Sequence, residues 1–139
     1  MSVEFHGAKA AVFLGAGLLV YQRDRGVPWP GYWDFPGGGR ESDEAPEACL
    51  RREVVEEFGV VLPDAAITWG KEVPSMVSDA QSAWFFVVHL PATTVVRFGD
   101  EGQRWAIMDP TDVMNLPNLV PALRSRFRQW LRDCGTEPI

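Results

Sequence analysis

The most constraining feature of this chain is the stretch from Gly38 to Val60, which reads GGRESDEAPEACLRREVVEEFGV. Within it, residues 45–58 contain few helix-breaking residues and predict a helix. Pro46 suits the first helical position, which makes Ala45 the N-cap. Gly59 suits the left-handed backbone conformation in which many helices end. Both ends of the helix are therefore predicted from the sequence alone.

This helix is expected to carry an acidic face beside an apolar one. Its apolar residues repeat every four positions, at Leu50, Val54 and Phe58. Glu53, Glu56 and Glu57 stand at i, i+3 and i+4 and gather beside that face, with Arg52 at its edge. Two carboxylates ~4 Å apart repel by about 4 kcal/mol at an effective dielectric of 20. The cluster is either a solvated face with Glu–Arg pairs or a cation site, and hard oxygen ligands suit Mg²⁺ or Mn²⁺.

The spacing of these residues resembles the Nudix box, G-x5-E-x7-R-E-U-x-E-E-x-G-U, in which U is aliphatic. Every specified position is matched between Gly38 and Val60. The resemblance covers nearly the whole chain and implies one Nudix hydrolase domain over residues 1–139. The implied fold is α/β, an α/β/α sandwich with a mixed sheet between helices. The implied reaction is hydrolysis of a nucleoside diphosphate linked to another group, with two or more Mg²⁺ or Mn²⁺ ions bound together with the substrate.

The same resemblance assigns a role to each residue of the box. Glu56 and Glu57 would be the main metal ligands, and Glu53 would be a further ligand or the general base. Arg52 would orient the glutamates by ion pairing. The backbone carbonyl of Gly38 would be an additional ligand, because glycine lets the backbone approach closely.

Two acidic residues outside this cluster have different expected roles. Glu44 is expected to brace the loop before the helix. Glu101, in the loop before Trp105, matches an acid that contacts metal in the MutT-like branch of the family; the alternative is a solvated turn residue. The resemblance leaves open whether Glu53 or Glu101 is the general base.

Nucleotide-binding residues are also implied by the MutT-like branch, which removes oxidised guanine nucleotides. Arg23 matches an arginine near the nucleotide, and Trp33 and Phe35 belong to a similar lead-in, WDFPGG. Asn118 either reads the edge of the base or caps the last helix. An arginine that this branch carries before its long aromatic strand is missing, because residues 79–81 read DAQ.

The substrate expected by default is a (d)NTP, including oxidised or non-canonical ones, that is cleaved to NMP and pyrophosphate. An ADP-ribose or nucleotide-sugar pyrophosphatase is an alternative, although Met76 stands where that branch has a proline. A nucleotide-sensing module without activity is opposed by the intact box. An isomerase of allylic diphosphates would need a catalytic thiol outside the box. Cys134 lies too near the end of the chain to supply it.

Charge and cysteine content restrict the partners. The net charge of −6 and the pI of about 4.8 argue against duplex nucleic acid or an anionic membrane. A small anionic nucleotide is still accommodated, because bound dications invert the local sign. Two cysteines form no disulfide framework, so a cytoplasmic protein is expected, as a monomer or homodimer.

The remaining elements are predicted from hydrophobic patterning. The apolar run over residues 10–20 predicts a buried strand rather than a signal peptide. The expected strands are residues 8–21, 32–35, 67–73, 83–90 and 103–108. A second helix is expected from Leu119 to Leu131, and loops over residues 27–31 and 90–102. The arginines of that helix are expected to form a solvated face: Arg124, Arg126, Arg128 and Arg132.

Overall fold

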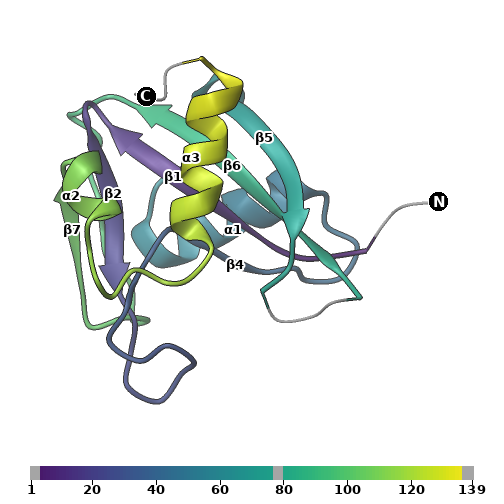
Figure 1. Cartoon of the computed structure of the whole chain (residues 1–139), viewed down its shortest axis with the longest axis horizontal. Coiled ribbons are helices and arrows are strands. Elements are labelled where there is room, and N and C mark those ends of the chain that lie inside the picture. The colour runs from purple at the N-terminus through teal and green to yellow at the C-terminus, as the bar shows by residue number, and fades with distance from the viewer. Residues whose placement is uncertain (1–3, 77–79, 136–139) are drawn as a thin grey trace.

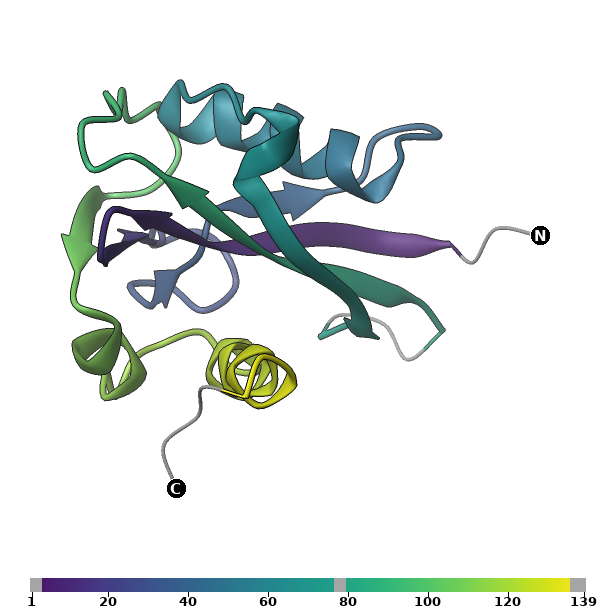
Figure 2. The same ribbon diagram turned by 90° about the horizontal axis from the view of Figure 1, so that it is seen from above.

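The computed structural model describes residues 4–76 and 80–135. These residues form a seven-stranded mixed sheet with helices on both faces (Figure 1 and Figure 2). Helix α1 (Pro46–Phe58) covers one face, whereas α2 (Pro110–Met114) and α3 (Leu123–Asp133) lie on the other. The predicted α/β/α sandwich is confirmed. None of the described helices is long and apolar enough to cross a membrane.

Strand β1 (Phe5–Leu14) lies at the centre of the sheet. It pairs in parallel with β6 (Ser82–Leu90) and antiparallel with β2 (Gly17–Gln22) and β4 (Gly37–Gly39). The outer strands all pair antiparallel: β3 (Trp33–Asp34) and β7 (Arg104–Met108) with β2, and β5 (Ile67–Pro74) with β6. A short 3₁₀ turn, Asp64–Ala66, leads into β5. The sheet therefore brings β4 and β1 together beneath α1.

Both faces of the central strands are buried, each in its own hydrophobic cluster. Along β1, Val12 packs with the α1 side and Phe13 with the α3 side, and β6 alternates in the same way with Phe86 and Phe85. This alternation is the period of two that a strand imposes on its side chains. Because neither face meets water, these strands read as continuous apolar runs in the sequence.

The single strand predicted over residues 8–21 is wrong, since the segment forms two antiparallel strands, β1 and β2. The turn between them contains Gly15, whose φ is +60°. A Cβ there would lie 2.8 Å from the Cβ of Ala92. Glycine is thus required by both the backbone conformation and the space. The turn was not predicted, because the residues on both sides of it are apolar and read as one continuous strand.

The predicted second helix begins later than expected. Ala122, with φ +75°, precedes α3, which starts at Leu123. The segment before it instead joins the sheet edge: Trp33 N donates to Asn118 O at 2.8 Å, and Val120 N donates to Trp33 O at 2.9 Å. Asn118 is therefore not the helix cap, and its side chain donates to the carbonyl of Gly31. Strand β4 and helix α2 were not predicted, since both are very short.

The ends of α1 agree with the prediction. Ala45 is the N-cap with extended backbone and no side-chain hydrogen bond, and Pro46 follows at the first helical position. Gly59 ends the helix in the left-handed region at φ +66°, and its N–H donates to Val55 O. The box residues are therefore fixed on a helix whose length is set by local sequence.

Candidate active site

Helix α1 turns two glutamates toward β4. Glu57 Oε1 accepts a hydrogen bond from the backbone N–H of Gly37 at 2.8 Å. A Cβ added at Gly38 would lie 2.7 Å from both carboxylate oxygens of Glu53, so only glycine allows this approach. Residues four apart share one helix face, which explains why both carboxylates meet the same strand.

Arg52 ties the acidic residues of this helix together. Its Nε and Nη2 donate to the carboxylate of Glu44 at 2.7 and 2.9 Å, and Nη2 also donates to the carbonyl of Gly39 at 2.8 Å. Its Nη1 lies 3.2 Å from carboxylate oxygens of Glu53 and Glu56. The hydrogen bond from Arg52 lowers the pKa of Glu44 to about 2. Arg52 thus offsets the repulsion among these carboxylates.

A second charged network surrounds the buried carboxylate of Asp34. Lys9 Nζ and Arg23 Nη1 each lie 2.8 Å from Asp34 Oδ2, and the hydroxyl of Tyr21 also donates to it. Lys9 donates further to the carbonyls of Phe35 and Gly37. A buried carboxylate is tolerated because it is paired and hydrogen-bonded. The network holds the turn between β3 and β4 in place.

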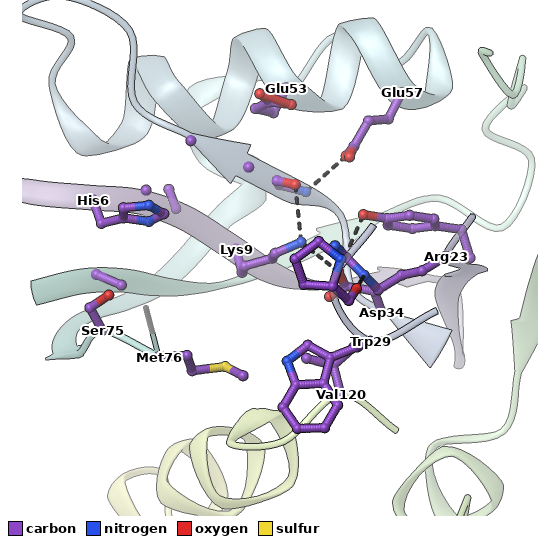
Figure 3. Close-up of a pocket in the computed structure, with 18 of the residues that line it drawn as sticks. His6, Lys9, Arg23, Trp29, Asp34, Glu53, Glu57, Ser75, Met76 and Val120 are labelled. Atoms are coloured by element: carbon purple, nitrogen blue, oxygen red, sulfur yellow. Dashed lines mark hydrogen bonds and ion pairs between the residues drawn. The ribbon is translucent and has the colours of Figure 1, made fainter. Parts of the chain in front are cut away.

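Glu53 and Glu57 of helix α1 and the network around Asp34 line one cavity of about 370 Å³. Figure 3 shows Glu53 and Glu57 projecting from α1 at one end, and Trp29, Met76 and Val120 toward α3 at the other. The Lys9–Asp34–Arg23 network lies between them. The cavity therefore has a carboxylate end and an end with apolar and aromatic walls. Its size and mixed lining suit a small organic anion.

Burial changes the ionisation of the groups at the carboxylate end. It raises the pKa of Glu57 to about 8, although the charge of Lys9 and the Gly37 hydrogen bond act in the opposite direction. Burial also raises the pKa of Glu53, with smaller contributions from the charges of Glu56 and Glu101 and an opposing one from Arg52. For Lys9, burial lowers the pKa, but the charge and hydrogen bond of Asp34 together with the charges of Tyr21 and Glu57 outweigh it, so the pKa is raised.

Comparison with known proteins agrees with the box and the fold. The family model described as NUDIX domain matches residues 5–131. The chain belongs to the Nudix family. Nudix hydrolases are pyrophosphatases that act on phosphorus-containing acid anhydrides, and this chain is such an enzyme.

Individual relatives are similar at modest identity. Nucleoside triphosphatase NudI of Escherichia coli is 33% identical over 111 residues, which are 73% of this chain and 78% of the relative. A putative 8-oxo-dGTP diphosphatase 2 of Mycobacterium tuberculosis is 39% identical over 57 residues, 41% of this chain and 40% of that protein. The Nudix hydrolase RenU of M. smegmatis has a similar fold, with TM-score 0.76 and 19% identity, and the alignment covers 100% of this chain and 91% of RenU.

The residues present suit the divalent metals that Nudix hydrolases generally use, such as Mg²⁺. The carboxyl groups of Glu53 and Glu57 face the cavity. Burial disfavours their ionised form, and a bound dication would stabilise that same form. Glu56 is turned to Arg52 at the surface. Accordingly, no group of three potential ligands is already gathered within the described part of the chain.

The structure brings only some of the predicted Nudix site residues into the cavity. The predicted residues that line it are Arg23, Gly38, Glu53, Glu57 and Glu101. Trp33, Phe35 and Asn118 do not line it: Trp33 and Phe35 are buried in the α3-side cluster, and Asn118 bonds to the loop before β3. Asp79, from the segment compared with the missing arginine, lies outside the described residues.

Sequence reasoning missed several cavity residues, of which four carry charge or an aromatic ring that matters to the site. Lys9 is the only charge within the apolar run of β1, and a lone cation in a buried strand was a signal that could have been used. Asp34 was read only as part of the lead-in. Trp29 falls in the predicted loop over residues 27–31, and its sequence neighbours give no reason to select it. Arg126 was assigned to the solvated face of the last helix, but it is buried and lines the cavity.

Proposed function

We propose that this chain is a Mg²⁺-dependent pyrophosphohydrolase that cleaves a nucleoside triphosphate, ribo or deoxy, to NMP and pyrophosphate. Oxidised and non-canonical nucleotides are included in this proposal. The observation that carries it is the division of one cavity into a carboxylate end on α1 and an aromatic, apolar end near α3. A triphosphate and a base need these two environments at opposite ends.

The name of NudI, a nucleoside triphosphatase, supports this substrate class. In the proposed reaction, a water oxygen bonds to phosphorus on one side of the α–β bridge. The bridging oxygen leaves with the other phosphorus, and a general base takes the proton from the water. When bound, Mg²⁺ would offset charge on the phosphates and lower the pKa of a bound water.

The box residues have distinct proposed roles in this reaction. Glu57, Glu56 and Glu53 would hold the metal, together with the carbonyl of Gly38. Either Glu53 or Glu101 would be the general base, since both line the cavity and their charges interact. Arg52 acts on the carboxylates rather than on the substrate and is a positioning residue.

The proposal is tested by incubating the protein with Mg²⁺ and a panel of (d)NTPs, ADP-ribose and dinucleoside polyphosphates. We expect NMP and pyrophosphate from at least one triphosphate, and no turnover with EDTA. Release of NDP and phosphate would contradict the proposed bond. Turnover of ADP-ribose alone would contradict the proposed substrate.

The general base is tested with Glu53→Gln and Glu101→Gln. Loss of a general base typically lowers turnover by ~10²–10⁴-fold. Glu47→Gln is the matched control, because Glu47 is exposed in the first turn of the same helix. If neither variant loses more than about tenfold in turnover, neither residue is the base.

A further inference from the structure

Arg126 differs from the other arginines of α3 in being buried, with only 7% of its surface exposed. It lies beside Phe127, in the part of α3 that packs on the sheet, whereas Arg128 on the same helix is exposed. The expectation of a solvated arginine face is therefore wrong at this position. A buried guanidinium is unusual enough to require an explanation, because arginine is almost never fully buried unless it is paired.

The hydrogen bonding of Arg126 is incomplete. Its Nη2 donates to the carbonyl of Pro74 at 2.8 Å, and no carboxylate of the described residues forms a salt bridge with it. A guanidinium has five N–H donors and no acceptor. No fully buried side-chain N or O atom in the described structure lacks a partner. The remaining nitrogens of Arg126 must therefore retain access to solvent, and the cavity that this residue lines supplies it.

The surroundings of Arg126 suit a flat aromatic ring. Trp29 and Met76 line the same cavity and are 44% and 40% exposed, which is high for large apolar side chains. Figure 3 places Trp29 and Met76 with Val120 at the end of the cavity away from Glu53 and Glu57. Aromatic faces and thioethers both stack against planar rings. If the phosphates of a nucleotide bind at the carboxylate end, as the proposed function requires, the base lies here.

The geometry points to Arg126 as a specificity-determining residue that selects nucleotides whose base presents a carbonyl oxygen. This inference rests on the proposed function. A guanidinium can only donate, so it matches a carbonyl acceptor and opposes an exocyclic amine. Guanine and hypoxanthine offer O6 and N7 side by side, which fit the two-pronged guanidinium; on the corresponding edge, thymine and uracil offer O4 without a neighbouring ring-nitrogen acceptor. Adenine lacks a carbonyl and presents an amine at the corresponding position.

The test compares kcat/KM for dGTP, dITP, dTTP and dATP in the wild-type protein and in Arg126→Met, Arg126→Lys and Arg128→Met. We expect the wild type to favour the carbonyl-bearing nucleotides over dATP by ~10-fold or more, with dGTP and dITP above dTTP. Arg126→Met should raise KM for dGTP about tenfold, with kcat and the dATP parameters little changed. Arg126→Lys should retain part of the preference, because it keeps a donor but loses the planar fork. Arg128→Met should behave as wild type.

Binding of α,β-methylene analogues of dGTP and dATP to the wild type gives a second readout that needs no turnover and no variant. Equal affinity for the two analogues, or equal kcat/KM for dGTP and dATP, would overturn the role of Arg126 while leaving the hydrolase intact. An Arg126→Met variant that still prefers dGTP over dATP would also overturn the role of Arg126. Absence of turnover with every triphosphate would instead defeat the proposed function. If Arg126→Met fails to fold, the role of Arg126 is tested by the preference of the wild type for dGTP over dATP and by the change of that preference in Arg126→Lys.

Discussion

The three consecutive glycines of β4 have different surroundings, so alanine at each has a different expected outcome. At Gly38, an added Cβ would stand 2.6 Å from Glu53 Cδ and 2.7 Å from both carboxylate oxygens. Since non-bonded carbons prefer about 3.5–4.0 Å, the carboxylate must withdraw by roughly 1 Å. The carboxylate is the end of a flexible side chain, so the fold accommodates this shift. Misplacement by about 1 Å costs ~100-fold in rate, and we expect Gly38→Ala to be folded and nearly inactive.

The neighbouring glycines provide the two matched comparisons. At Gly37, φ is +129°, and an added Cβ would lie 2.1 Å from Ala8 O and 2.7 Å from Lys9 Cα. Backbone atoms cannot withdraw as a side chain can, and the φ alone costs about 1–3 kcal/mol, so Gly37→Ala should fold poorly. At Gly39, nothing lies within 4 Å of the added Cβ. Gly39→Ala should therefore change the free energy of unfolding by no more than about 0.5 kcal/mol and leave activity intact.

The assay is turnover of a triphosphate with Mg²⁺, together with thermal unfolding, for the wild type and all three variants. We expect loss of activity without loss of stability for Gly38→Ala, loss of both for Gly37→Ala, and loss of neither for Gly39→Ala. Wild-type turnover in Gly38→Ala would refute the placement of the Glu53 carboxylate. An equal loss of melting temperature in Gly38→Ala and Gly37→Ala would refute the distinction between side-chain and backbone contacts.

Two further predictions concern stability. Ala45→Thr should raise the free energy of unfolding by about 0.5–1 kcal/mol, because the N-cap has the right backbone and lacks a side-chain acceptor; denaturant unfolding that shows no gain would contradict it. Without metal, Glu57 keeps a proton in the folded state up to a pKa of about 8, whereas the unfolded chain releases it near 4.5. The free energy of unfolding of the metal-free protein should thus fall between these pH values, by at most about 1.4 kcal/mol per pH unit, relative to Glu57→Gln. Denaturant titrations at three pH values with EDTA measure this, and an equal pH dependence in both proteins would oppose it.

Local signals explain why α1 could be predicted almost to the residue. Pro46 and Gly59 act through backbone conformation at their own positions, so no knowledge of the tertiary structure was needed. The spacing of Arg52 and the glutamates is likewise a property of one helix. The fold class followed from the order of elements along the chain, together with the resemblance that the box established.

The parts that could not be predicted depend on contacts between distant segments. The turn at Gly15 was hidden because both faces of β1 and β2 are buried, which removes the alternation of polar and apolar residues. The start of α3 depends on pairing of residues 118–120 with Trp33, far away in sequence. Likewise, periodicity places Arg126 among exposed arginines, and only the position of Pro74 makes it a buried donor.

The pairing of Trp33 with both Asn118 and Val120 has a consequence for the length of the ligand. The next residue, Asp34, holds Lys9 and Arg23 in the middle of the cavity, while Val120 belongs to its far wall. Strand β3, which contains only Trp33 and Asp34, thus anchors both the middle and the far wall of the cavity. Main-chain hydrogen bonds fix the span between the two. If a nucleotide binds as proposed, one with fewer or more phosphates would have to change its own conformation, because this span of the scaffold is held in place.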